Sequence, residues 1–465
     1  MAVYLSHYGR RDCYILQPNI GESIKGAEQT RENSHHSSGG LVPASVNDQW
    51  NYLLATIWDQ MIHLLIRFDG HIDETILDLA VRDALLAEPL TGMKFIPGAT
   101  PFFERVCIDT GIPAWTGIHN TATPDKTLEE LFATPLDPLR GPMVRISLLR
   151  SDDDLLCISF NHTITDAYGV KSFGSLIARL YRSGICGGGF LPVKNSHDRS
   201  FSSILSQFSA AKCREASRRL ETRTVASRIP FSSFRRGKRR YATLAIEKDL
   251  FLNMRDYTRI HGITVNDLLL SSYVLALAEL APVFEGTCIP VLTSIDLRRY
   301  LSPDMYPSLA NLSVAFELPI IIPAGSSPAG IVSQIHDLMS VSKSGHAGIG
   351  AALLLCKEFD HGFRHVEKEL RDMERESREG FLPKNPFFTN LGVIPDGVID
   401  YGVPVKTAWM LGPVEYPPGF GLAACSFRDC LTLSVGFSGE ALEREWVYSF
   451  LLSMKNYLSQ IISQV

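Results

Sequence analysis

The sequence feature that most constrains the fold is a short apolar run followed closely by a long helical repeat. The run Leu155–Phe160 is rich in strand-forming residues and has the length of a buried strand. Beyond it, apolar residues recur at intervals of three and four, which predicts one buried helix face. These residues are Val170, Phe173, Leu176, Ile177, Leu180 and Tyr181. A strand-to-helix junction is therefore expected between residues 161 and 169.

Two polar side chains stand four residues apart at this junction, His162 and Asp166. A rigid element on each side can fix the orientation of such side chains, which is what a catalytic site requires. A histidine after a buried strand is also often a hydrogen-bonded core residue, and the spacing alone leaves both interpretations open. The junction is the first place in the chain to look for chemistry.

The 465 residues exceed what one ordinary hydrophobic core accommodates, so we expect two lobes. The order strand, helix, strands, helix in the first half predicts a mixed α/β lobe. Apolar periodicity weakens and basic charge accumulates between the halves. We therefore divide the chain into an N-terminal lobe at 1–185, a basic crossover linker at 186–240 and a C-terminal lobe at 241–465.

Composition excludes several classes of function. The net charge of −5 gives no general case for binding nucleic acid or an anionic membrane surface. The nine cysteines are scattered without a CxxC pair, which is typical of reduced thiols in a cytosolic protein. His35 and His36 lie in a Gly- and Ser-rich stretch at 19–45 without other ligands at a useful spacing, so we predict a flexible loop and no metal site. Neither a signal peptide nor a membrane span is evident, and we expect a soluble cytoplasmic protein that is a monomer.

Basic residues gather in the crossover at 211–240, where eleven Lys and Arg residues face only two acidic ones. Such a run is either a solvated face or a phosphate-binding patch for a nucleotide-like cofactor or an acidic carrier protein, since clustered arginines bind phosphate through charge-assisted hydrogen bonds. The candidates for the second interpretation are Arg235, Arg236 and Arg239.

The second half of the chain places two arginines, Arg298 and Arg299, directly after the predicted strand Ile289–Ile295. A mostly apolar and therefore buried helix is expected over 268–278, and the segment 367–379 is predicted to be a charged, solvent-facing helix. Strands are expected at 387–392, 422–427 and 431–437, followed by a closing amphipathic helix.

Taken in order, five blocks of the sequence resemble the HxxxD acyltransferase superfamily, which includes chloramphenicol-acetyltransferase-like enzymes, alcohol O-acyltransferases and condensation domains. The blocks are 138–146, the motif Asn161-His162-Thr163-Ile164-Thr165-Asp166-Ala167, the helix start at 264–270, Asp296-Leu297-Arg298 and 389–392. The resemblance covers roughly residues 50 to 460. It implies an α/β fold of two chloramphenicol-acetyltransferase-like lobes, each a mixed sheet with helices, with the active site in a tunnel between them.

The resemblance also implies roles for individual residues. His162 would be the general base that takes a proton from a hydroxyl or amine as that group attacks an acyl thioester. Asp166 would face away from the substrate and pair with an arginine, for which Arg298 is the candidate. A backbone N–H near Gly169, or the side chain of Asn390, would stabilise the oxyanion.

The same resemblance implies an acyltransferase without a permanently bound cofactor. Acyl-CoA or an acyl-phosphopantetheine on a carrier protein would be the co-substrate, and the acceptor would be a small, secondary metabolite. Two alternatives stay open: a condensation-like cyclisation or a pericyclic step on one substrate, and a non-catalytic binding protein with a decayed motif.

Two positions depart from the condensation-type motif HHxxxDG. Asn161 replaces its first histidine, which argues against peptide-bond formation more than against acyl transfer. Ala167 replaces its glycine, which would supply backbone conformations that a Cβ disfavours.

Overall fold

The computed structural model describes residues 40–106, 115–188, 190, 198–218, 220, 229–281, 288–303, 306, 309–323, 325–379 and 384–463. The pair His35 and His36 and the middle of the basic run at 221–228 lie outside these ranges. Residues 41–43, which belong to the loop predicted over 19–45, form the short strand β1 (Leu41–Pro43).

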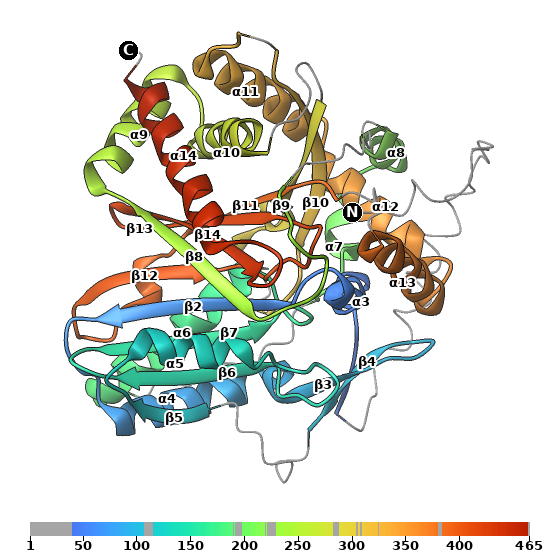
Figure 1. Ribbon diagram of the computed structural model, residues 1–465. Helices are drawn as coiled ribbons and strands as arrows, with labels where there is room; N and C mark the ends of the chain where they lie inside the picture. The colour runs from blue at the N-terminus through green and yellow to red at the C-terminus, as the bar shows by residue number, and fades with distance from the viewer. Residues whose placement is uncertain are drawn as a thin grey trace.

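The first half of the chain builds a five-stranded mixed sheet with the order β12-β2-β7-β6-β5. Its strands are β12 (Val405–Leu411), β2 (Met61–Phe68), β7 (Asp154–Asn161), β6 (Val144–Arg150) and β5 (Trp115–Asn120). The helices of this lobe are α4 (Glu74–Ala87), α5 (Pro124–Ala133) and α6 (Ala167–Ile185), which lie with the sheet in the lower part of Figure 1. A small sheet of β1, β4 (Phe102–Arg105) and β3 (Met93–Ile96) lies beside it.

The second half builds a six-stranded mixed sheet with the order β10-β9-β11-β13-β14-β8. Its strands are β10 (Ser313–Ile321), β9 (Cys288–Asp296), β11 (Phe387–Val393), β13 (Gly421–Phe427), β14 (Cys430–Ser438) and β8 (Arg239–Ile246). In the upper part of Figure 1 this sheet is accompanied by α9 (Lys248–His261), α10 (Val265–Leu280), α11 (Pro328–Ser344) and α14 (Arg444–Ile462). The helix α10 is buried along most of its length, as its apolar sequence predicts.

Shorter elements complete the described chain. They are the helices α3 (Val46–Leu53), α7 (Ser202–Leu205), α8 (Ala210–Arg218), α12 (Ala347–Phe359) and α13 (Phe363–Arg378), and the 3₁₀ turns η1 (Leu54–Thr56), η2 (Pro89–Gly92), η4 (Leu297–Tyr300) and η6 (Asp396–Val398). Within the described ranges no single helix is long and apolar enough to cross a membrane, and the one pair that reaches this length and composition together, α9 with α10, is bent by 111°.

One strand of the second half of the chain joins the sheet of the first half. β12 belongs to the second half by sequence, yet it pairs antiparallel with β2 in the sheet of the first half. The predicted boundaries at 185 and 241 do not include this crossing, because strand partners more than 300 residues apart leave no local pattern. The crossing ties the two lobes together at one side of the space between their sheets (Figure 1).

The prediction that 367–379 is a helix with charge on every side is wrong for one face. Phe363, Val366 and Leu370 of α13 are each at most 2% exposed, and this face packs against α3, η1 and α12. The apolar residues occur at intervals of three and four, but two of the three precede the segment on which the prediction was based. The helix therefore covers the core rather than standing free in solvent.

Candidate functional site

The motif loop joins β7 to α6, as the sequence pattern predicts. Asn161, the last residue of β7, fixes the loop with both ends of its amide: Nδ2 donates to the carbonyl of Leu136 at 2.9 Å, and Oδ1 accepts from the backbone N–H of Thr163 at 2.9 Å. The backbone N–H of His162 donates to the carbonyl of Gln60 at 2.7 Å. Asn161 is therefore a buried structural residue, and an amide is suited to this place because it both donates and accepts.

Ala167 does not impose the conformational problem that its Cβ suggested. It is the first residue of α6 and does not adopt a positive φ angle, so glycine is not needed at this position. Asp166 is the N-cap of the helix, and its Oδ1 accepts from the N–H of Gly169 at 3.3 Å. The loop thus reaches the helix in an ordinary capped geometry.

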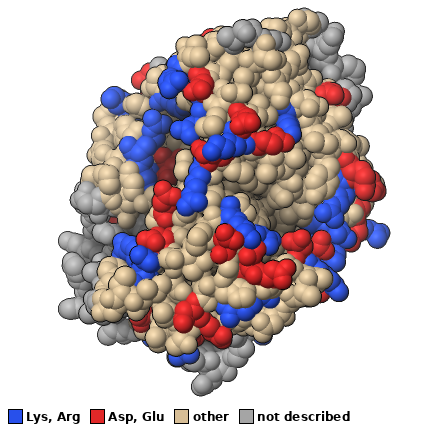
Figure 2. Space-filling view, turned by 90° about the vertical axis from the view of Figure 1, so that its left-hand side faces the viewer, with Lys and Arg blue, Asp and Glu red and all other residues tan. Residues whose placement is uncertain are grey.

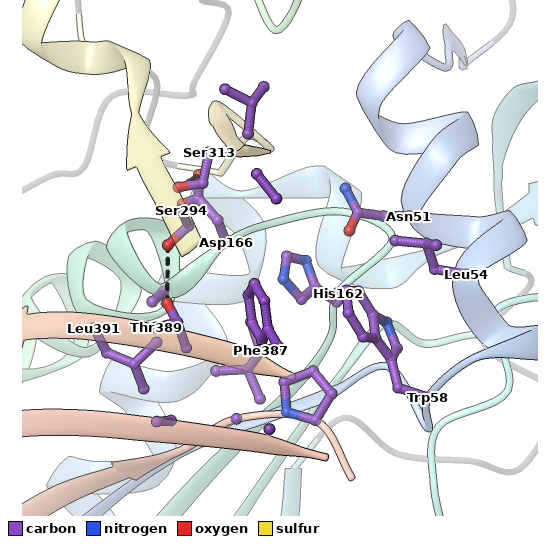
Figure 3. A pocket seen from close by; sticks show the side chains of 18 of the residues that line it. Asn51, Leu54, Trp58, His162, Asp166, Ser294, Ser313, Phe387, Thr389 and Leu391 are labelled. Carbon is purple, nitrogen blue, oxygen red and sulfur yellow. Dashed lines mark hydrogen bonds between the residues drawn. The ribbon is translucent and has the colours of Figure 1, made fainter. Parts of the chain in front are cut away.

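The side chain of His162 lies in a cavity of about 220 Å³ between the two lobes. Trp58, just before β2, and Phe387, at the start of β11, lie on either side of the imidazole in Figure 3. The indole of Trp58 lies nearly parallel to the imidazole, at an interplanar angle of 16° with ring centroids 6.4 Å apart, and its centroid lies 6.1 Å from that of Phe387. The cavity wall is therefore built from both halves of the chain.

Asn311, in the loop before β10, determines which nitrogen of His162 carries the proton. Its Nδ2 lies 2.9 Å from the carbonyl oxygens of His162 and Thr163 and 3.1 Å from Oδ1 of Asp48, so its two protons are shared among three acceptors. Because carbonyl oxygens can only accept, the amide must be oriented with Oδ1 toward Nδ1 of His162, 3.1 Å away. Nδ1 then carries the proton, and Nε2 keeps a free lone pair.

Asn311 is itself held by a buried ion pair. Asp48, in α3, receives Nη2 of Arg199 at 2.7 Å, and the same guanidinium donates to the carbonyl of Ile164 in the motif loop at 3.0 Å. Arg199 also donates to the carbonyl of Leu309. This network joins α3, the motif loop, the crossover and the loop before β10, so it holds both lobes around the histidine.

Burial lowers the pKa of His162 below its usual value, although its own carbonyl, Asp166 and Asn311 act in the opposite direction. The neutral imidazole is therefore the dominant form at neutral pH. Neutral imidazole with a free Nε2 is the form that accepts a proton.

The predicted ion pair between Asp166 and Arg298 is present and buried. Nη1 of Arg298 lies 2.8 Å from Oδ2 of Asp166, and both side chains are at most 3% exposed. The same carboxylate oxygen accepts from the N–H of Leu312 at 2.9 Å, while Nη2 of Arg298 donates to the carbonyl of Ala310 at 3.0 Å. The pair thus connects the motif loop of the first lobe to two parts of the second lobe. These are η4, which follows β9, and the loop before β10.

Two opposing effects act on the Asp166 carboxyl. Burial raises its pKa, but the charge of Arg298 and the hydrogen bonds to Arg298 and Leu312 outweigh burial, so the net pKa is lowered. Asp296, whose Oδ1 lies 3.2 Å from the same guanidinium, has a raised pKa because of burial and repulsion from Asp166. Asp166 is therefore the ionised partner of Arg298, and it cannot serve as a base.

The two candidates for oxyanion donors differ in outcome. The backbone N–H of Gly169 itself is not available, since it donates to Asp166 inside the helix cap, which leaves the other N–H groups near it as candidates. Asn390 does line the cavity, although its Oδ1 accepts from the N–H of Gly392 at 2.9 Å. The N-cap side chain of a helix accepts from an N–H group of the first turn, which here is that of Gly169. The spacing of the motif did not reveal this bond.

Of the three candidate arginines in the crossover, two bind other parts of the protein. Arg236 pairs with Glu374 of α13 at 2.9 Å and donates to the carbonyl of Thr56. Nε of Arg239 lies 3.2 Å from Oδ2 of the buried Asp59. Arg235 is exposed. These two pairs use part of the charge of the candidate patch, and on the face shown in Figure 2 basic and acidic side chains are interspersed.

Sequence reasoning missed a pair of hydroxyls in the cavity wall. Oγ of Ser294 on β9 and Oγ1 of Thr389 on β11 lie 2.9 Å apart (Figure 3). One proton is used between the two oxygens, so the other hydroxyl retains a proton that it can donate to a ligand. Only the presence of Thr389 in the block 389–392 could have drawn attention to this place, because Ser294 lies on a different strand.

No protein-family model matches the sequence, and none of the curated proteins matches it. Solved structures do. The epimerization domain of the third module of tyrocidine synthetase B is 16% identical, with a TM-score of 0.65 over 93% of this chain and 99% of that one. The first condensation domain of the CDA synthetase is 14% identical, with a TM-score of 0.66 over 92% and 97%.

An acetyltransferase is also among the similar structures. The trichothecene 15-O-acetyltransferase of Fusarium sporotrichioides is 14% identical, with a TM-score of 0.59 over 92% of this chain and 97% of that one. At such low identity the likeness concerns the fold and not the reaction. The chain therefore has the two-lobed fold of condensation domains and chloramphenicol-acetyltransferase-like proteins, as the order of its motifs predicted.

Proposed function

We propose that the protein is an acyltransferase that moves an acyl group from a thioester to a hydroxyl or amine of a small molecule, with His162 as the general base. The observation that carries this proposal is the imidazole of His162 in a cavity between the lobes, with Nδ1 bonded to Asn311. The similar structures include an acetyltransferase and condensation domains, so the fold is one that also occurs in proteins of this reaction class.

In the proposed reaction, Nε2 of His162 takes the proton from the acceptor as its oxygen or nitrogen attacks the thioester carbonyl. The carbonyl oxygen becomes an oxyanion. The hydroxyl of the pair Ser294 and Thr389 that keeps its proton would donate a hydrogen bond to this oxyanion. The intermediate then expels the thiolate, which receives the proton from the imidazolium. Asp166 and Arg298 do not exchange protons; they hold the loop that carries the base.

The acyl donor in this proposal is a co-substrate, either acyl-CoA or an acyl-phosphopantetheine on a carrier protein, and the acceptor is a small, secondary metabolite. The experiment that tests the reaction is intact-mass analysis of products after incubation with a panel of acyl-CoAs and a metabolite extract, with His162→Ala as the control. A product heavier by one acyl group, absent with the variant, is the expected result. Single-substrate turnover without a thioester would contradict it.

Asn311→Ala is expected to lower kcat by about 10- to 100-fold with little change in KM, because the imidazole loses the group that fixes its orientation and tautomer. The matched control is Asn47→Ala. The amide of Asn47 donates to the carbonyls of Asn311 and Ser313, so its loss loosens the same loop, but it makes no hydrogen bond to His162. Equal losses of kcat in the two variants would show that loop packing, not the contact to the imidazole, is responsible.

The pH dependence of the reaction follows from the lowered pKa of His162. A base must be neutral, and a lower pKa extends the neutral form to lower pH. We expect kcat to stay level on acidification through the ordinary histidine value of about 6.5 and to decline only below it. The measurement is a pH profile of kcat with donor and acceptor both saturating, so that groups that only bind the acceptor do not contribute; an acidic limb centred above 6.5 would rule out His162 as the titrating base.

A further inference from the structure

Another ionisable side chain that lines the cavity is Glu415, in the segment between β12 and β13. It lines the same cavity as His162 and is 7% exposed. Among the described residues its carboxylate accepts no hydrogen bond and has no ion-pair partner within 4 Å, although the charge of Lys384 acts on it electrostatically. Burying a carboxylate is costly unless it is hydrogen-bonded, and Lys384 does not supply hydrogen bonds here, so the two oxygens remain able to accept them from a ligand.

Other buried carboxylates of the described chain are partnered, which makes Glu415 distinctive. Asp48 pairs with Arg199, Asp154 with Arg150, and Asp166 with Arg298. Even Asp59, beside Arg239, accepts two backbone N–H groups. The protein therefore supplies hydrogen-bond or ion-pair partners to these buried carboxylates. Glu415, in the wall of the cavity, differs from them in this respect.

Two glycines leave room for the Glu415 carboxylate. A Cβ at Gly419 would lie 2.5 Å from Oε2, and a Cβ at Gly421 would lie 2.5 Å from Oε1, both closer than side chains approach. Gly421 begins β13 and also lines the cavity. The backbone of this segment is thus shaped around the carboxylate, as expected of a group that is kept in place for a purpose other than internal pairing.

Aromatic side chains line the same cavity as this carboxylate. Trp58 pairs with Glu415 through an isolated antiparallel bridge between their backbones, and Phe387 lies 6.1 Å from the Trp58 ring. Both rings line the cavity. A carboxylate combined with aromatic faces is the chemistry that binds a protonated amine, by charge and by cation–π attraction.

We propose that Glu415 binds a protonated amine carried by the molecule that fills the cavity, which in the proposed function is the acyl acceptor. Such an acceptor would bear a basic nitrogen near Glu415 in addition to the nucleophilic group at His162. The identification of the ligand as the acceptor rests on the proposed function, whereas binding of an amine does not. In support, burial raises the pKa of Glu415 to about 7 and Lys384 opposes this rise, as a bound ammonium would do.

The test compares amines with neutral molecules of the same shape. Isothermal titration calorimetry at pH 7.5 would measure 2-phenylethylamine against 2-phenylethanol, and cyclohexylmethylamine against cyclohexylmethanol. We expect the wild-type protein to bind at least one amine tenfold or more tightly than its alcohol, and Glu415→Gln to reduce this preference to twofold or less. Glu130→Gln, which changes an exposed acid of α5, should keep the full preference.

Two further variants keep the result interpretable. Gly421→Ala, which keeps the charge but displaces the carboxylate, should also lose the preference, with folding checked by circular dichroism. His162→Ala should retain it, since the imidazole is not needed for amine binding. No preference in the wild-type protein, or a preference that survives in Glu415→Gln, would overturn the proposal. If acyl transfer is nevertheless observed, only the assignment of Glu415 fails and the proposed function stands.

Discussion

Replacing His162 with alanine is expected to lower kcat/KM by about 10²- to 10⁴-fold, which is the usual contribution of a general base, while the protein stays folded. The side chain lies in the cavity rather than in the packed core, so its removal leaves no apolar void. The loop keeps its shape in the variant, because the bonds made by Asn161 and by the backbone of residue 162 do not depend on the imidazole.

The matched control for this variant is His71→Ala, which removes an exposed histidine that contacts only the carbonyl of Ser151 among the described residues. It should retain wild-type activity. The measurements are initial rates with the donor and acceptor identified by mass analysis, together with circular dichroism and thermal unfolding. Full activity of His162→Ala would refute the role of His162 as the base. If that variant does not fold, the rate is measured instead on His162→Gln, which keeps a polar side chain of similar size but removes the base.

Replacing Asp166 with alanine is expected to lower the free energy of unfolding by about 3–5 kcal/mol, the cost of leaving one member of a buried ion pair alone. Arg298 would lose its 2.8 Å partner, the N–H of Leu312 would lose its acceptor, and α6 would lose its cap. Activity should fall as well, since the same contacts hold the loop that carries His162. Urea denaturation followed by tryptophan fluorescence and circular dichroism measures the loss.

Asp296→Ala is the control for this prediction. Asp296 contacts the same guanidinium at 3.2 Å, but its side chain is 42% exposed and repels Asp166, so we expect a loss of about 1 kcal/mol or less. The sign of the pH dependence is a second check. Because the pKa of Asp166 is lowered on folding, its contribution is present above the ordinary aspartate pKa of about 3.9 and disappears as the pH falls through the folded value. Equal losses of unfolding free energy in the two variants would mean that the buried pair of Asp166 with Arg298 contributes no more to stability than the exposed Asp296 does.

Local patterns in the sequence were sufficient for most of the elements that carry the site. The strand over 155–160, the helix that begins after Asp166 and the buried helix over 268–278 all follow from apolar periodicity, and the structure contains each of them. The pairing of Asp166 with Arg298 was expected from the resemblance, not from any spacing between residues 132 positions apart. The charged segment 367–379 was misjudged because its apolar partners lie mostly before it.

The residues that surround His162 could not be predicted in this way. Asn311 lies 149 positions from the histidine that it orients, and Glu415 reaches the cavity only because β12 crosses to the other lobe's sheet. Arg236 and Arg239 form ion pairs with Glu374 and Asp59, which are distant in sequence, so the basic run itself gave no sign of these partners.

The sequence by itself determined the strand-to-helix junction that presents His162 and Asp166, since the periodicity of apolar residues dictates which faces are buried over a few turns. The tertiary structure alone decided that Nδ1 is the protonated nitrogen, that the N–H of Gly169 is used within the helix cap, and that the carboxylate of Glu415 stands in the cavity wall. Hydrogen-bond partners and charges act over a few ångströms in space, and chain folding, not sequence distance, determines which of them meet.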